Sequence, residues 1–221
     1  MNLYLYPGVT LALWVVGLWL LLRDVDTRWP DKEEHGSKNR KTALIYGLVM
    51  LFVTEGAAVM FLTLYRDVDP WTAVKRLSLL CVMWPVALTD LKTYRIPNAF
   101  ILFGLACRVL IFPFELFCSE PGVWQVLLTE VIAAGAMLLA SVLCALIIRN
   151  SIGFGDMKLF LVMGLLLGTR GIWGAVFLSL IVIFFISVFA LITKRKSRKD
   201  LIPFGPALVI GTYLAVYLTG M

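Results

Sequence analysis

Two aspartates lie at the ends of apolar runs, where their carboxyl groups could do chemistry together. Asp90 closes the run CVMWPVALTD, and Asp156 follows the glycines of GFGDMKL at the start of another run. Ionising an acid against an apolar span is costly, and two such acids held together can share one proton. One carboxyl group then activates a water molecule as a general base while the other protonates a carbonyl oxygen. Peptide-bond hydrolysis by this route needs no metal ion and no cofactor.

The residues around the two aspartates suit an extended peptide. Gly153 and Gly155 allow backbone torsions and close approaches that a side chain would block, which predicts clearance for a substrate beside the second aspartate. Pro97 restricts the residue before it to extended geometry, so a helix is expected to begin near Asn98. Lys158 would favour the ionised form of the nearby carboxylate, but a residue two positions along a helix faces elsewhere.

The composition indicates an integral membrane protein. Hydrophobic residues make up 61% of the 221 residues and charged residues only 15%, against about 45–50% and about 25% in soluble domains. The net charge of +6 is interpreted as membrane topology, not as a nucleic-acid surface. The four cysteines, Cys81, Cys107, Cys118 and Cys144, form no C-x-x-C pair and are predicted to be small buried hydrophobes. No set of zinc ligands is present.

Eight apolar runs are candidate membrane helices. They cover about 3–22, 43–65, 73–89, 98–117, 123–148, 157–168, 171–192 and 201–220. Twelve residues rise only about 18 Å in a helix, so the sixth run could be a re-entrant segment instead of a full span. The sequence therefore predicts an all-α integral membrane protein, a single polytopic domain over residues 1–221. It has about eight transmembrane helices, or seven if 157–168 is re-entrant.

The placement of basic residues favours eight spans with both termini outside. In that topology 15 of the 20 basic residues fall in inside loops. The five exceptions are Arg66, Lys75, Arg76 and Arg170 outside, and Arg108 within a span. Without the sixth span, the basic run KRKSRK would move outside, against the positive-inside rule. This topology makes residues 23–42 a cytoplasmic loop and places both aspartates at the inner face, although they are 66 positions apart.

The residues alone also allow three non-proteolytic roles for the aspartates. An acid at a helix start complements the helix dipole, so Asp90 and Asp156 could be helix caps. They could form a proton relay in a transporter, although relay acids are expected nearer mid-membrane. They could also belong to a non-catalytic assembly subunit, in which both would tolerate asparagine.

Two further charged residues fall midway along spans. Glu55 lies in the second run and Arg108 in the fourth, and charges at such depth usually pair or line a wet cavity. A structural Glu55–Arg108 pair is therefore a hypothesis, with Glu115 and Glu130 expected toward the outer face.

Three motifs in order resemble those of the type IV prepilin peptidases, which are polytopic aspartic proteases of the G-x-G-D class. The motifs are D-x-x-x-x-x-IPN from Asp90 to Asn98, GFGDMKL from Gly153 to Leu159, and IPFGPALVIG from Ile202 to Gly211. The resemblance runs from about Cys81 to the C-terminus, with the catalytic motifs within 81–164. It implies that Asp90 and Asp156 cleave a short basic leader from pilin-like precursors, at the cytoplasmic face of a prokaryotic cell membrane and among its lipids.

The chain departs from the family pattern in its first loop. Many bacterial members have a long cysteine-containing loop there and also methylate the new N-terminus, whereas residues 23–42 are short and lack cysteine. We therefore predict a minimal peptidase of the tight-adherence or competence type, without N-methyltransferase activity. The PAL sequence, Pro206 to Leu208, also resembles presenilin-like proteases, but Asp90 follows Thr89 instead of a tyrosine, and the IPN element favours the pilin branch.

Overall fold

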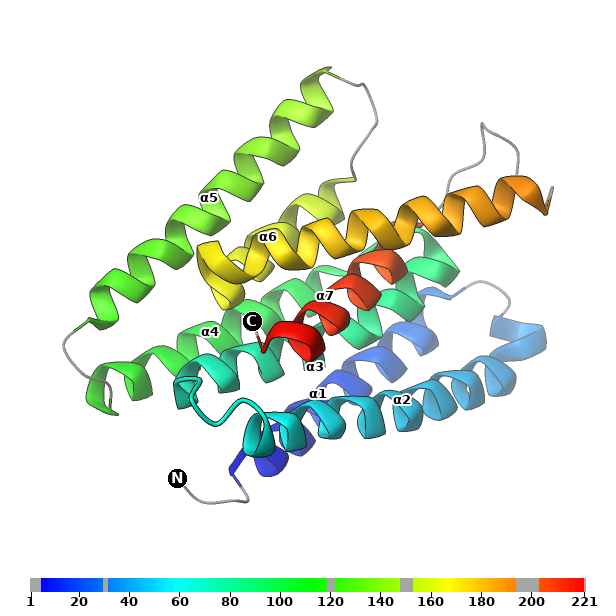
Figure 1. Ribbon diagram of the computed structural model, residues 1–221. Coiled ribbons are helices and arrows are strands. Elements are labelled where there is room, and N and C mark those ends of the chain that lie inside the picture. Colours follow the sequence, from blue (N-terminus) through cyan, green and yellow to red (C-terminus); the bar gives the residue numbers. More distant parts are fainter. Residues whose placement is uncertain (1–4, 30–31, 119–121, 148–152, 194–202, 221) are drawn as a thin grey trace.

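The protein is an all-helical bundle in the computed structural model, which describes residues 5–29, 32–118, 122–147, 153–193 and 203–220 (Figure 1). The helices are α1 (Leu5–Arg28), α2 (Lys32–Thr63), α3 (Pro70–Thr93), α4 (Asn98–Cys118), α5 (Val123–Ile147), α6 (Phe154–Ile192) and α7 (Gly205–Thr219). Six are long and apolar enough to cross a membrane, and α7 is a shorter apolar helix. The predicted all-α membrane class is confirmed. The basic run KRKSRK lies outside the described residues.

The longest helix, α6, consists of two arms. Gly168 interrupts it with φ 65° and ψ −174°, a backbone region that essentially only glycine adopts. Figure 1 shows the yellow-green first arm and the yellow-to-orange second arm folded back on each other. The arms correspond to the predicted runs 157–168 and 171–192, so the described chain contains eight helical segments within seven helices. The first arm, residues 154–167, rises about 21 Å, which is less than the roughly 30 Å of a hydrocarbon core.

The central helix of the bundle is α3. It packs against α1, α2, α4, α6 and α7, and side chains such as Leu77, Leu80 and Trp84 are wholly buried. It has the lowest hydropathy of the six long helices and the largest buried share. Lipid-facing side chains must be apolar, whereas interior ones can pair with one another. This difference explains why α3 carries buried polar residues, Asp90 and Lys75 among them.

Small residues bring α6 close to both of its main neighbours. A Cβ atom added to Gly164 would lie 2.5 Å from the Cα of Ala134 in α5, and one added to Gly211 of α7 would lie 2.4 Å from the backbone nitrogen of Ser179. Such contacts allow helix backbones to approach where lipid supplies no hydrophobic driving force. The first arm of α6 is thereby held against α5, and the second arm against α7.

The first two helices extend beyond their apolar runs. α1 continues to Arg28 and α2 begins at Lys32, so most of the segment 23–42 is helical. Their outer faces carry exposed apolar side chains, for example Trp19 and Phe52. These faces suit contact with lipid.

Candidate active site

Asp90 lies in the last turn of α3, against the first residue of α7. Its side chain is only 7% exposed, and its Oδ2 accepts a hydrogen bond of 2.8 Å from the backbone N–H of Gly205. The helix α3 ends just beyond it, where Tyr94 adopts a left-handed conformation and donates its N–H to the Asp90 carbonyl. The N-terminus of a helix carries partial positive charge, so α7 presents a favourable electrostatic environment to this carboxylate.

Asp156 lies in the first turn of α6 and is half-buried. Gly153 is the N-cap residue of this helix, and its backbone amide hydrogen-bonds the Asp156 carboxylate. An acidic side chain in the first turn that reaches back to the N-cap amide is a recognised capping arrangement. The side chain thus stabilises the start of α6 and still faces Asp90 closely enough for the two charges to interact.

The two aspartates line one pocket of about 340 Å³. Its other walls come from the segment between α3 and α4 and from the start of α6, and they include Tyr94, Arg95, Asn98, Gly155 and Lys158. Residues separated by 66 positions therefore meet at one end of the bundle. Two carboxyl groups in one pocket can hold a water molecule between a base and an acid.

The glycines of GFGD contribute small size, not unusual torsions. Gly153 has φ −73°, a value that any residue adopts, so conformational freedom is not the reason for glycine there. A Cβ atom at Gly155 would lie 3.0 Å from the Cβ of Ile96, and one at Gly153 would lie 3.3 Å from Oδ2 of Asp156. The absence of these atoms lets α6 begin directly against the IPN segment.

A side-chain hydrogen bond joins the two motifs. Lys158 donates from Nζ to Oδ1 of Asn98 over 3.0 Å, and Asn98 is the first residue of α4, immediately after Pro97. Sequence reasoning placed the start of this helix correctly and named Lys158 as a supporting residue, with the reservation that it would face away from Asp156 on one helix. Its partner lies on α4, and this contact could not be read from spacing along one helix.

Sequence reasoning also missed Gly205 as a site residue. A Cβ atom there would lie 2.7 Å from Oδ2 and 2.9 Å from Cβ of Asp90. The available signal was the segment IPFGPALVIG, which was noted for its resemblance but given no contact with either aspartate. The structure gives the start of α7 a defined role in holding Asp90.

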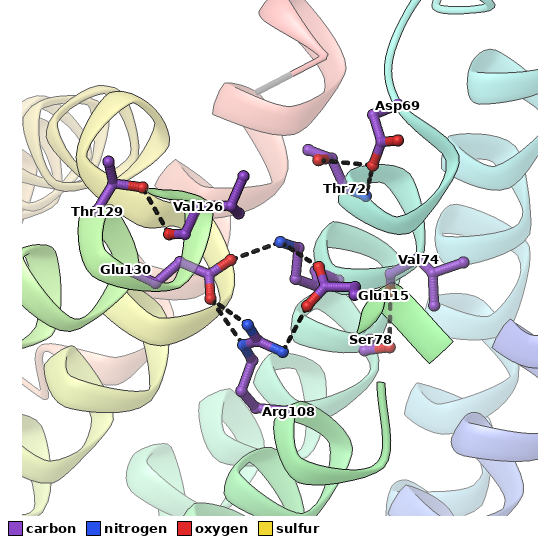
Figure 2. Close-up of polar contacts among 10 residues, drawn as sticks. Asp69, Thr72, Val74, Ser78, Arg108, Glu115, Val126, Thr129 and Glu130 are labelled. Carbon is purple, nitrogen blue, oxygen red and sulfur yellow. Dashed lines mark hydrogen bonds and ion pairs between the residues drawn. The ribbon is translucent and has the colours of Figure 1, made fainter. Parts of the chain in front are cut away.

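The predicted Glu55–Arg108 pair is wrong. Glu55 accepts a 2.6 Å hydrogen bond from the hydroxyl of Thr10, whereas Arg108 contacts Glu115 at 2.8 Å and Glu130 at 2.6 Å. Figure 2 shows the Arg108 guanidinium between these two carboxylates.

Lys75 completes this buried cluster. Its Nζ lies 2.7 Å from Glu115 and 2.5 Å from Glu130, and all four side chains of the cluster are at most 7% exposed. We call Lys75, Arg108, Glu115 and Glu130 the charged quartet. It carries two charges of each sign and joins α3, α4 and α5. Lys75, which sequence reasoning only counted among the basic residues on the outer side, is buried inside the bundle.

The four cysteines divide into two kinds. Cys81 and Cys107 are buried, as predicted, whereas Cys118 and Cys144 are exposed. The prediction was wrong for these two because Cys118 ends its helix and α5, which bears Cys144, packs mainly against α6. Among the residues that the structure describes, no group of three or more His, Cys, Asp or Glu side chains is placed to hold a metal ion.

Comparison with known proteins agrees with these motifs. Residues 77–192, which include both aspartates, match the model of the type IV leader peptidase family. The chain is also 35% identical over 157 residues to the prepilin leader peptidase/N-methyltransferase of Bacillus subtilis (strain 168), an alignment that covers 70% of this chain and 58% of that relative. The chain therefore spans less than two thirds of that relative's length, and no solved structure gives a significant match. Because the family model covers more than half of the sequence, the chain belongs to the type IV leader peptidase family.

Proposed function

We propose that this chain is a membrane aspartic endopeptidase with Asp90 and Asp156 as its catalytic pair. The observation that carries the proposal is their shared pocket at one end of the bundle. The capping bond from Gly153 accounts for an acid at the start of α6. It does not account for a second, buried carboxyl group facing the first, and general acid–base hydrolysis requires such a pair.

The proposed reaction begins with one carboxylate ionised and its partner protonated. The ionised group removes a proton from water as the water oxygen attacks the peptide carbonyl carbon, and the partner donates its proton to the carbonyl oxygen. The tetrahedral intermediate then collapses as the carbon–nitrogen bond breaks. The leaving nitrogen takes a proton from the group that accepted one from water, and a hydroxyl of the intermediate returns its proton to the partner carboxylate as the new carboxyl group forms. The products are a new carboxyl end and a new amine, and the pair again holds one proton.

The proposed substrate is a pilin-like precursor with a short basic leader, a small residue at the cut and an apolar helix. The relative's printed name, prepilin leader peptidase, supports this choice. In the proposed topology both termini are outside, and the pocket faces the cytoplasm of a prokaryotic cell. The substrate backbone would lie in the pocket that Gly153 and Gly155 line, while Lys158, Pro97 and Asn98 hold the adjoining segments in place.

The proposal covers hydrolysis alone. The name of the Bacillus subtilis relative also includes a second activity, N-methyltransferase. We do not propose that activity for this chain. The segment 23–42 of this chain has no cysteine, which is the basis for proposing a peptidase without methylation of the product.

A reconstituted cleavage assay tests the function. The full chain in liposomes is mixed with a precursor that carries a basic leader, a glycine and roughly 20 apolar residues. Mass spectrometry is expected to show one cut, after the glycine. If the precursor stays intact and protons cross the membrane of the same liposomes, the peptidase proposal is rejected in favour of a transporter that uses the same acids.

A further inference from the structure

A second cavity, of about 460 Å³, also reaches Asp156. We call it the apolar groove, and its walls include Ser141, Cys144, Phe160, Leu180 and Phe204. These residues come from α5, both arms of α6 and the N-cap position of α7. The groove shares Asp156 with the catalytic pocket, and its remaining walls are mainly apolar.

The elements that form the groove are separated at one end. Figure 1 shows α5 and the second arm of α6 diverging toward the end of the bundle where the first arm begins. Beyond the groove, large apolar side chains are exposed on both diverging helices, among them Leu146 at 76% and Phe189 at 63%. The hydroxyl of Ser141 is satisfied by the carbonyl of Met137. The groove therefore offers an apolar surface rather than polar binding groups.

Asp156 thus stands at a boundary between two environments. On one side, the catalytic pocket presents polar groups such as Arg95, Asn98 and Lys158; on the other, the groove presents side chains such as Phe160 and Leu180. A polypeptide whose polar part occupies the pocket and whose apolar part occupies the groove must pass Asp156 at the change from polar to apolar. This position is where a peptide bond must lie to be cut.

We infer that the apolar groove binds the apolar segment that directly follows the cleaved bond in the substrate. This inference rests on the proposed peptidase function and assigns a location to part of its substrate. A cavity of this size is typical of a ligand site and holds a few side chains. The groove therefore takes one face of the first turns of the substrate helix, and the rest of that helix lies in lipid. A bound lipid chain is the competing occupant.

Disulfide cross-linking tests the location, because Cys144 already lies in the groove. Asp90→Asn, which leaves the groove intact, serves to retain uncut precursor, and Cys118→Ser removes the other exposed cysteine. Single cysteines are placed along the first turns of the precursor's apolar helix, and copper–phenanthroline is added. A matched control carries Cys144→Ala and Leu146→Cys, which moves the thiol two positions along α5 to an exposed site outside the groove.

The expected result is cross-linking through Cys144 at cysteines one helical turn apart, with little through Leu146→Cys. Equal yields at the two positions, or none at Cys144, would overturn the inference and leave lipid as the occupant. Cleavage by the unmodified chain, measured in parallel, separates this failure from failure of the peptidase itself. If the unmodified chain cuts nothing and Cys144 forms no cross-link, both proposals are rejected.

A second experiment partly fills the groove. Leu180→Trp enlarges a half-exposed wall residue, and Leu139→Trp makes the same change on the lipid-facing side of α5. We expect Leu180→Trp to lower kcat/KM about tenfold, mainly through a higher KM, and Leu139→Trp to cleave like the unmodified chain. Equal activity of the two variants would overturn the inference.

Discussion

Replacing Gly205 by alanine is predicted to disable Asp90 without touching either aspartate. The new Cβ atom would lie 2.7 Å from Oδ2 and 2.9 Å from Cβ of Asp90, closer than non-bonded carbon and oxygen atoms tolerate. Either Asp90 or the start of α7 must move, and the 2.8 Å hydrogen bond between them is then lost. A hydrogen bond to a charged group contributes about 1.5–3 kcal/mol, so kcat/KM is expected to fall roughly 10- to 100-fold.

The assay is cleavage of the same precursor by Gly205→Ala in liposomes, under conditions where product formation is linear. Gly135→Ala is the matched control, because no atom lies within 4 Å of a Cβ atom added there. Both variants must first elute in detergent as a single species with an unchanged melting temperature. Full activity of Gly205→Ala would refute the role of α7 in positioning Asp90.

Three further predictions concern residues around the site and in the core. Lys158→Met and Asn98→Ala should each slow cleavage by only a small factor, because the hydrogen bond between these two side chains is exposed. The double variant should be no slower than either single variant. Additive losses of activity would show that the two residues do not act as a pair. Glu130→Gln should destabilise the fold by about 3–5 kcal/mol, because it leaves buried positive charge uncompensated. Glu55→Gln is the control and should have a smaller effect, because glutamine keeps an acceptor for the Thr10 hydroxyl. Equal melting temperatures of the two variants in detergent would contradict this prediction. Gly168→Ala should cost about 1–3 kcal/mol through backbone strain, and an unchanged melting temperature would show that the turn tolerates a side chain.

The positions of the helices were largely predictable because the membrane restricts what a span can be. A span needs about 20 apolar residues, and seven of the eight predicted runs had at least seventeen. The short run 157–168 was correctly recognised as helical, but the turn that follows it depends on the backbone of Gly168. The polar residues Thr169 and Arg170 marked a break after Gly168, but they did not show that the chain turns there within one continuous helix.

Contacts between helices were less predictable because hydropathy gives the depth of a residue but not its direction. Arg108 and Glu55 are both predicted midway along spans, yet Glu55 contacts Thr10 of α1, whereas Arg108 contacts Glu115 and Glu130. The Lys158–Asn98 bond and the contact of Gly205 with Asp90 cross between helices in the same way. Only the proximity of Asp90 and Asp156 could be inferred, from the number of predicted spans between them, and both line one pocket.

Measuring leader release by Asp90→Asn and Asp156→Asn, beside the unmodified chain, tests the central claim most directly. Asparagine preserves the size of each side chain but cannot accept or donate the catalytic proton as a carboxyl group does. Each variant, at equal amounts of folded protein in liposomes, is predicted to release no detectable leader while the unmodified chain processes the precursor. Release by either variant at the unmodified rate would contradict the assignment of these aspartates as a catalytic pair.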